Sequence, residues 1–176
     1  EAGGHNGIDE TTTLCLVPQV VDAVDIPVIA AGGIADGRQI LAALALGAEG
    51  VQIGTRFAVT VESSAHENYK RAVIAADDGG TVLTLKKIIP VRAVKNAFIL
   101  AMQEAERNGA TKEQLIELIG KKRERLGIFE GDTENGEIEA GQSSGLVKEL
   151  LTVDELMQKL LREYREAMSD SKNWEM

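Results

Sequence analysis

The sequence is poor in aromatic residues, in cysteine and in positive charge. Only 3% of its 176 residues are aromatic, one is a cysteine (Cys15), and 19 lysines and arginines stand against 28 acids, for a net charge of −9. A single cysteine excludes a disulfide within the chain, which fits a reducing compartment, and we expect a cytoplasmic location. The acidic balance argues against a nucleic-acid surface, which needs clustered basic residues to contact phosphates.

Long apolar runs are also missing. No run approaches the roughly 20 residues that a membrane-spanning helix needs, and the sequence opens on Glu1 with no basic and then apolar leader. We therefore expect no membrane and no nucleic acid among the partners, and small molecules or proteins instead. With 44% hydrophobic residues, the chain has enough apolar material for a core of its own.

Residues 1–62 alternate short apolar runs with helical patterns. The spacing predicts a helix over 14–24, a strand over 27–31, a helix over 36–47 and a strand over 50–54. Both strands are nearly uninterrupted apolar runs, which is typical of a parallel sheet buried on both faces. We therefore expect the last βα units of a parallel α/β fold.

Residues 63–150 have the pattern of a helical insertion with a loop rich in glycine and acids, and 151–176 that of a C-terminal helix with a frayed tail. Helices are predicted over the ranges 63–76, 90–109, 111–127 and 152–168, with the loop over 129–145 and the tail from 169. Thr111 and Thr152 are expected as N-caps, and Gly109 and Gly127 as C-terminal stops.

Glycines follow each of the two predicted parallel strands directly. Gly32 and Gly33 come after the first strand, and Gly54 and Thr55 come after Ile53, the last apolar residue of the second. Backbone N–H groups at such turns are not covered by Cβ atoms, and a following helix adds partial positive charge. Two adjacent loops of this kind match the phosphate site of (β/α)₈ barrels. The alternative is that the glycines only allow tight turns.

His5 follows a glycine pair in the opening stretch EAGGHNG, where a packed core residue is poorly placed. Imidazole can take or give a proton near neutral pH, so His5 is a candidate catalytic group, although a solvated or loop-stabilising histidine fits equally well. His66 lies in a polar helical stretch and is assigned no role. No histidine and cysteine pattern indicates zinc.

Three other features are interpreted as structural. Ser63 and Ser64 indicate a helix cap, since the glycines of a nucleophile elbow are missing around them. The acids of 130–139 lack the last ligand of a calcium loop, so no metal site is predicted. Cys15 falls on the apolar side of its predicted helix and is expected to be packed.

Four stretches together resemble a known flavoenzyme family. EAGGHNG (1–7), IPVIAAGGIADGRQI (26–40), GAEGVQIGTRF (47–57) and GDTENGEIEAGQSSGL (131–146) are similar to the C-terminal half of the FMN-dependent enoyl-acyl-carrier-protein reductase II and nitronate monooxygenase (2-nitropropane dioxygenase) family. The resemblance runs from residue 1 to about 165. It implies the C-terminal part of a (β/α)₈ TIM-type barrel with an appended helical segment.

The resemblance also implies roles for single residues. The FMN phosphate would lie on the loops described above, and His5 would face the isoalloxazine ring. The segment of Gly141, Gln142 and Ser143 resembles the family loop that returns to the flavin edge. The implied cofactor-binding residues are Ala31, Gly32, Gly33, Gln52, Gly54, Thr55, Gln142 and Ser143.

The two members of the family do different chemistry. The reductase uses NADH or NADPH to reduce the double bond of an enoyl-acyl-carrier-protein in fatty acid synthesis, and the monooxygenase oxidises alkyl nitronates with oxygen. The extended segment 131–150 and the VRAVKN stretch at 91–96 are closer to the reductase branch, which we favour. A non-catalytic half-barrel that binds anions is the alternative from another class.

A complete (β/α)₈ barrel needs about 250 residues, and this chain supplies only about three of its strands. We therefore expect the chain to be part of a longer polypeptide that also holds the N-terminal half of the barrel. A homodimer that uses the helical additions after residue 63 is a further possibility. The substrate would be a small molecule or an enoyl group carried by acyl carrier protein.

Overall fold

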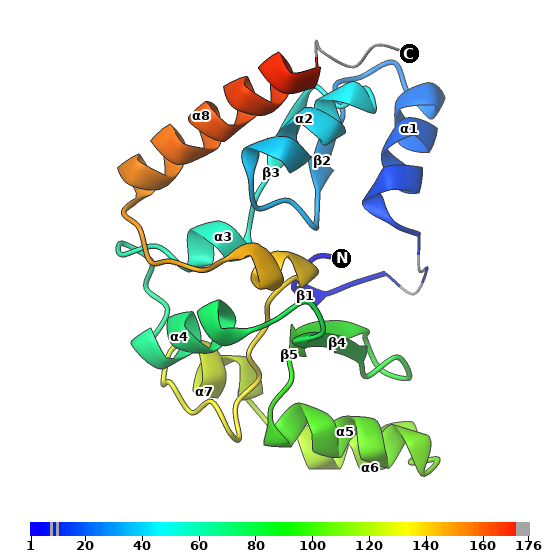
Figure 1. Cartoon of the computed structure of the whole chain (residues 1–176). Coiled ribbons are helices and arrows are strands. Elements are labelled where there is room, and N and C mark those ends of the chain that lie inside the picture. The colour runs from blue at the N-terminus through cyan, green and yellow to red at the C-terminus, as the bar shows by residue number, and fades with distance from the viewer. Residues whose placement is uncertain (8, 10, 172–176) are drawn as a thin grey trace.

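A computed structural model describes residues 1–7, 9 and 11–171. Its elements fall into two regions that meet at a central layer (Figure 1). One region holds the parallel strands and the longest helix, and the other holds an antiparallel sheet and the shorter helices. The central layer contains the N-terminal residues, α3 (Thr55–Ala58) and the 3₁₀ helix η1 (Gln142–Leu146). Within the described residues, no helix is long and apolar enough to cross a membrane.

The parallel region is a βαβ unit, as the apolar spacing predicts. β2 (Ile29–Ala31) and β3 (Gly50–Gln52) pair in parallel and are joined by α2 (Gly37–Ala45), while α1 (Thr13–Ala23) precedes them. The side chain of Asp36 caps α2 by accepting hydrogen bonds from the two backbone N–H groups of Arg38 and Gln39. Apolar side chains from α1, β2 and α2 form the core of this region.

Helix α8 (Val153–Ser171) lies against α2 and closes the outer side of the parallel region (Figure 1). The approach is close, because a Cβ on Gly37 would come within 2.1 Å of the backbone nitrogen of Tyr164. Thr152 caps α8 as expected, since its hydroxyl accepts from the N–H of Glu155 at 3.2 Å. The helix continues to Ser171, three residues into the tail expected to fray, and residues 172–176 lie outside the described part.

The second region is built on an antiparallel sheet that the sequence reading did not predict. Its strand order is β1 (Gly4–His5), β5 (Val91–Val94) and β4 (Thr81–Thr84). The helix expected over 90–109 is therefore wrong in its first part, and α5 (Ala97–Arg107) begins only after its N-cap Asn96. The strand forms because β5 has partners on both edges, which outweighs the local helical spacing.

The helix expected over 111–127 is two helices. α6 (Lys112–Ile119) starts at the predicted cap Thr111 with a complete capping box, and α7 (Arg123–Ile128) follows after a break. The break falls at Gly120 and Lys122, whose φ angles are +68° and +61°. Gly109 ends α5 as predicted, with φ +83°, but Gly127 lies inside α7.

Two smaller expectations, for Cys15 and for the serines at 63 and 64, are wrong. Cys15 is exposed on α1, so the expected packing of its thiol is wrong. The expected seryl cap is also wrong: α4 (Glu67–Ala75) begins after Ser63 and Ser64 and is capped by the imidazole of His66, which accepts from the N–H of Asn68. The hydroxyl of Ser63 accepts from the N–H of Ala65 in the turn before the helix. His66 thus has a structural role that the sequence reading did not assign.

Candidate functional site

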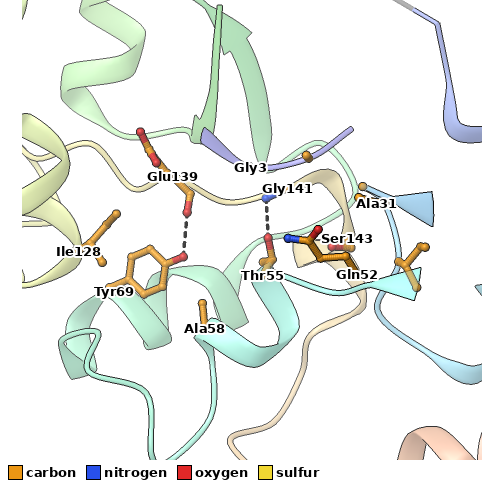
Figure 2. Close-up of a pocket in the computed structure, with 15 residues that line it drawn as sticks. Gly3, Ala31, Gln52, Thr55, Ala58, Tyr69, Ile128, Glu139, Gly141 and Ser143 are labelled. Carbon is orange, nitrogen blue, oxygen red and sulfur yellow. Dashed lines mark hydrogen bonds between the residues drawn. The ribbon is translucent and has the colours of Figure 1, made fainter. Parts of the chain in front are cut away.

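A cavity of about 360 Å³ opens between the two regions, at the carboxyl ends of β2 and β3. Four stretches of chain bring their residues to it: the N-terminal residues, the two glycine loops after the parallel strands, and the segment 139–143 (Figure 2). The side chains of α3, α4 and α7 complete the wall. The lining residues are Ala2, Gly3, Ala31, Gly32, Gly33, Ile34, Gln52, Gly54, Thr55, Ala58, Tyr69, Ile128, Glu139, Gly141 and Ser143.

The two glycine loops converge on this cavity. Gly32 and Gly33 have φ angles of +100° and +74°, which side chains rarely adopt. The N-terminal residues lie close behind them, because a Cβ on Gly32 would be 3.3 Å from the backbone nitrogen of Ala2. A Cβ on Gly54, by contrast, would meet no atom within 4 Å, and Gly54 lines the cavity. At its three glycines this wall is therefore bare backbone, a cradle that suits a phosphate group, beside the side chains of Ile34, Gln52 and Thr55.

Thr55 connects the glycine wall to the segment 139–143. Its hydroxyl oxygen accepts a hydrogen bond from the N–H of Gly141 at 2.9 Å (Figure 2). The next N–H along, that of Gln142, donates to the carbonyl oxygen of Glu1 at 3.0 Å. These two bonds hold residues distant in sequence around one opening, and Ser143 then lines it from η1.

Tyr69 supports the opposite wall from α4. Its hydroxyl donates a hydrogen bond to the backbone carbonyl of Glu139 at 2.8 Å, and the residue is only 3% exposed (Figure 2). Burial raises the pKa of Tyr69 far above its usual value, with the nearby charge of Glu139 acting in the same direction. The tyrosine therefore stays a neutral donor that fixes the backbone at Glu139.

Glu139 in this wall, and Glu137 two residues before it and outside the cavity lining, are acids whose carboxyls are hard to ionise. Burial raises the pKa of Glu137 to about 7, and the neighbouring charges of Glu139 and Glu124 add to the effect. Burial also raises the pKa of Glu139, while the charge of His5 acts against that rise. Within the described residues, the Oε1 atom of Glu137 is buried with no hydrogen-bond partner.

The structure brings together most of the residues predicted for the site. Seven line the cavity: Ala31, Gly32, Gly33, Gln52, Gly54, Thr55 and Ser143. Gln142 instead lines a separate polar cavity beside Asn6 and Arg92. His5 is exposed in β1, two residues from the cavity-lining Gly3, and its imidazole interacts electrostatically with Glu139 rather than lining the cavity. The roles of all nine residues remain predictions.

Sequence reasoning missed the side-chain wall, which consists of Ala58, Tyr69, Ile128 and Glu139. One weak sequence signal could have indicated that Tyr69 is buried: it lies four residues before Val73, on the apolar face of its helix. That spacing predicts burial but not a place beside a cavity. The alternation of Glu137, Ile138 and Glu139 is strand-like, and nothing local indicates which strand it meets.

Comparison with known proteins identifies the family and the fold that this chain shares. The family model described as nitronate monooxygenase matches residues 1–163. A probable nitronate monooxygenase from Staphylococcus saprophyticus is 46% identical over 116 residues, which are 59% of this chain and 32% of that protein. The aligned part thus spans about a third of the curated relatives.

Two solved structures match nearly the whole chain. FabK from Thermotoga maritima superposes with a TM-score of 0.91 and 41% identity over 99% of this chain and 55% of its own. Nitroalkane oxidase from Streptomyces ansochromogenes gives a TM-score of 0.77 and 32% identity over 96% of this chain and 50% of its own. Both are TIM-barrel enzymes of which this chain spans about half, so the fold class expected from the sequence is confirmed.

Proposed function

The chain belongs to the nitronate monooxygenase family, and from this premise we propose that it forms the cofactor-binding half of an FMN-dependent oxidoreductase. The observation that carries the proposal is the convergence of two bare glycine loops on one cavity. A ligand phosphate could accept hydrogen bonds from the N–H groups of the three glycines, which carry no side chain. The residues present therefore fit the phosphate end of FMN.

In this proposal Gly32, Gly33, Gly54 and Thr55 hold the phosphate, and Ala31 and Gln52 lie beside it. Ser143 approaches the flavin from η1, and Gln142, the residue before it, lies at the separate polar cavity. When bound, FMN supplies a reversible hydride acceptor, with NADH or NADPH as the reductant. The chain itself contributes positioning and charge, since its wall at Tyr69 and Glu139 is buried and hydrogen-bonded.

His5 is the residue to which we assign proton chemistry. Its place in β1, beside the cavity edge formed by Gly3 and Glu139, would let an imidazole N–H bind a substrate carbonyl or give up its proton. Its exposure in this half of the barrel is consistent with a group that meets substrate rather than core.

We propose the reduction of enoyl-acyl-carrier-protein as the first candidate reaction. The likeness to FabK supports it, because it extends over 99% of the chain and includes the segment 131–150 and the strand VRAV. Oxidation of alkyl nitronates is the second candidate. It is supported by the family model and by curated relatives 44–46% identical over about 60% of the chain.

A partner for this half is part of the proposal. The apolar side chains of Leu14 on α1, Ile26 in the connection after α1 and Ile29 on β2 are 66%, 70% and 55% exposed. In a closed barrel this side would face the preceding βα unit. We propose that the N-terminal half of the same barrel covers it. A homodimer remains a prediction.

The test uses the full-length protein, purified with whatever it binds. We expect the yellow absorption of a flavin and oxidation of NADH or NADPH in the presence of an acceptor. Crotonyl thioester as the acceptor would identify the reductase, whereas turnover of an alkyl nitronate with oxygen would identify the monooxygenase. A colourless protein that binds only inorganic phosphate at the glycine loops would instead support a non-catalytic anion-binding protein.

A further inference from the structure

Arg56, the residue after Thr55, has the kind of side chain that often binds a phosphate directly. Among the described residues, however, the cavity lining includes Gly54 and Thr55 but not Arg56. The arginine is 3% exposed, and its Nη1 atom donates a hydrogen bond to the backbone carbonyl of Glu149 at 3.1 Å. Its Nη2 atom lies 3.8 Å from the Oε1 atom of the same residue. Arg56 thus contacts the C-terminal part of the chain instead of the cavity.

Lys159 on α8 continues this contact toward α2. Its Nζ atom forms an ion pair with the Oε1 atom of Glu149, the same oxygen that Arg56 approaches, and lies 3.7 Å from the Oε1 atom of Glu163. The Oε2 atom of Glu163 accepts a hydrogen bond at 3.2 Å from the N–H of Gly37, the first residue of α2. A continuous series of charged contacts therefore runs from the first turn of α3 to the first residue of α2.

Both ends of this series are tied to a glycine loop. Gly54 and Thr55 directly precede Arg56, so the second loop moves with the arginine. At the other end, the Nε2 atom of Gln39 on α2 donates to the carbonyl of Gly33 at 2.6 Å, and its Oε1 atom accepts from the N–H of Ala35 at 2.7 Å. A shift of α2 would therefore displace the first loop.

The backbone before α8 also pairs with the chain that leaves α3. Leu151 forms a parallel bridge with Thr60, and its carbonyl accepts from the N–H of Val61 at 2.9 Å. Figure 1 shows this stretch of chain passing α3 between η1 and α8, and α8 packs against α2. Residues 149–163, which we call the C-terminal brace, thus contact both helices that follow the glycine loops.

The charges of this network balance one another. Two cations, Arg56 and Lys159, face two acids, Glu149 and Glu163. Burial lowers the pKa of Arg56, and the charges of both acids act against that effect. The hydrogen bond from Lys159 is the main cause that lowers the pKa of Glu149. The network therefore offers a ligand no net positive charge, which favours a role in holding the loops over direct attraction of an anion.

We propose that the C-terminal brace fixes the spacing of the two glycine loops. Its positioning residues are Arg56, Glu149, Lys159 and Glu163. This role rests on the proposed binding of the FMN phosphate at those loops. A phosphate that accepts hydrogen bonds from both loops at once needs them at a fixed separation, because such bonds weaken steeply as distance and angle depart from their optimum.

The first test compares the affinities of FMN and riboflavin, which lacks the phosphate, for the apoprotein of the full-length chain. Glu149→Gln should lower FMN affinity by about three- to tenfold and leave riboflavin affinity unchanged. Direct electrostatics predicts the opposite sign, since this variant removes a negative charge near the phosphate. Lys159→Met should give a similar loss of FMN affinity, whereas Lys159→Arg should retain it because the charge is kept.

Each kind of substitution has a matched control. Glu166→Gln removes an exposed acid from the same helix, and Lys148→Met removes a lysine whose Nζ atom donates to a backbone carbonyl at the end of α4. Neither control should lower FMN affinity. The proposal is overturned by an unchanged or higher FMN affinity in Glu149→Gln or Lys159→Met. It is also overturned by an equal loss of FMN and riboflavin, or by controls that lose as much FMN affinity as these variants.

The second test needs no flavin and also covers the case in which Glu149→Gln fails to fold. Backbone hydrogen exchange in the apoprotein of Lys159→Met should be at least about threefold faster at residues 32–35 and 54–56, and unchanged there in Lys148→Met. Faster exchange confined to α8 would contradict the proposal. Faster exchange at both loops in a protein that binds neither flavin would show that the brace holds the loops and that the proposed function has failed.

Discussion

The two walls of the central cavity are built in opposite ways. The glycine wall, residues 31–34 and 52–55, is bare backbone at its three glycines, where a Cβ at Gly54 would meet nothing, and also carries the side chains of Ile34, Gln52 and Thr55. The side-chain wall, formed by Ala58, Tyr69, Ile128 and Glu139, presents a buried hydroxyl and a carboxyl that is hard to ionise. The glycine wall can hold the cofactor that both candidate reactions would share, whereas the side-chain wall can select the substrate and handle protons. Substitutions in the glycine wall should therefore lower FMN affinity, whereas substitutions in or next to the side-chain wall should change stability or KM.

The largest effect is expected in the glycine wall, from Gly33→Val. The φ of +74° at this position strains any side chain, and the Cβ would lie 3.2 Å from the Oε2 atom of Glu1. We expect FMN affinity to fall by at least about 100-fold, since strain of a few kcal/mol would displace the loop. Titration of the apoprotein with FMN, followed by absorbance, measures this.

Gly79→Ala is the matched control for that variant. Its Cβ would meet only a side-chain oxygen of Asp77 at 3.8 Å, and Gly79 does not line the cavity. FMN affinity should be unchanged in the control. Full retention of FMN by Gly33→Val would mean that the glycine wall is not the phosphate site.

A smaller effect is expected from ionisation of Glu137, which lies next to the side-chain wall. It concerns the free energy of unfolding and not the binding of the cofactor. The folded pKa of Glu137 of about 7 lies above the ordinary value of 4.5, so the folded protein holds the proton more tightly than the unfolded chain does. Its contribution to the free energy of unfolding is therefore greatest at low pH. It falls as the pH rises from about 4.5 to about 7, by about 1 to 3 kcal/mol.

Glu137→Gln should remove that part of the pH dependence. The difference in unfolding midpoint between pH 5 and pH 8 should shrink in this variant relative to the unsubstituted protein. Glu117→Gln, at an exposed position on α6, should leave the difference as it was. An equal pH dependence in Glu137→Gln and the unsubstituted protein would show that the carboxyl ionises freely in the fold.

The two walls also differ in how far the sequence alone predicts them. The glycine wall depends on a βαβ unit whose strands and helix follow each other within about 30 residues, and its elements lie within a few residues of the predicted ranges. Local periodicity and glycine placement suffice there because the contacts are local. Six of the predicted residues, Ala31, Gly32, Gly33, Gln52, Gly54 and Thr55, consequently line the cavity from this wall.

The side-chain wall depends on contacts between distant segments. Tyr69 reaches Glu139 across 70 residues, and β5 is a strand because β1, β4 and the segment at Ile138 all pair with it. The stretch VRAV has apolar spacing that also suits a helix, so the pattern could not decide between the two. Exposure of Cys15 has the same origin, since the apolar face of α1 is only partly covered in this chain.

The smallest effect is expected from Tyr69→Phe. The variant keeps the buried ring but removes the donor to the Glu139 carbonyl, which would be left buried without that bond, at a cost of about 1 kcal/mol. The free energy of unfolding should fall by about that amount in denaturant titrations. FMN affinity should not change, because no atom of the glycine wall is touched. KM for the substrate should rise a few-fold as the Glu139 backbone loosens.

Tyr164→Phe, on α8 and not part of the cavity lining, is the control for loss of a tyrosyl hydroxyl. A loss of FMN in Tyr69→Phe comparable to that in Gly33→Val would mean that the two walls bind one ligand jointly and that their division of roles is wrong.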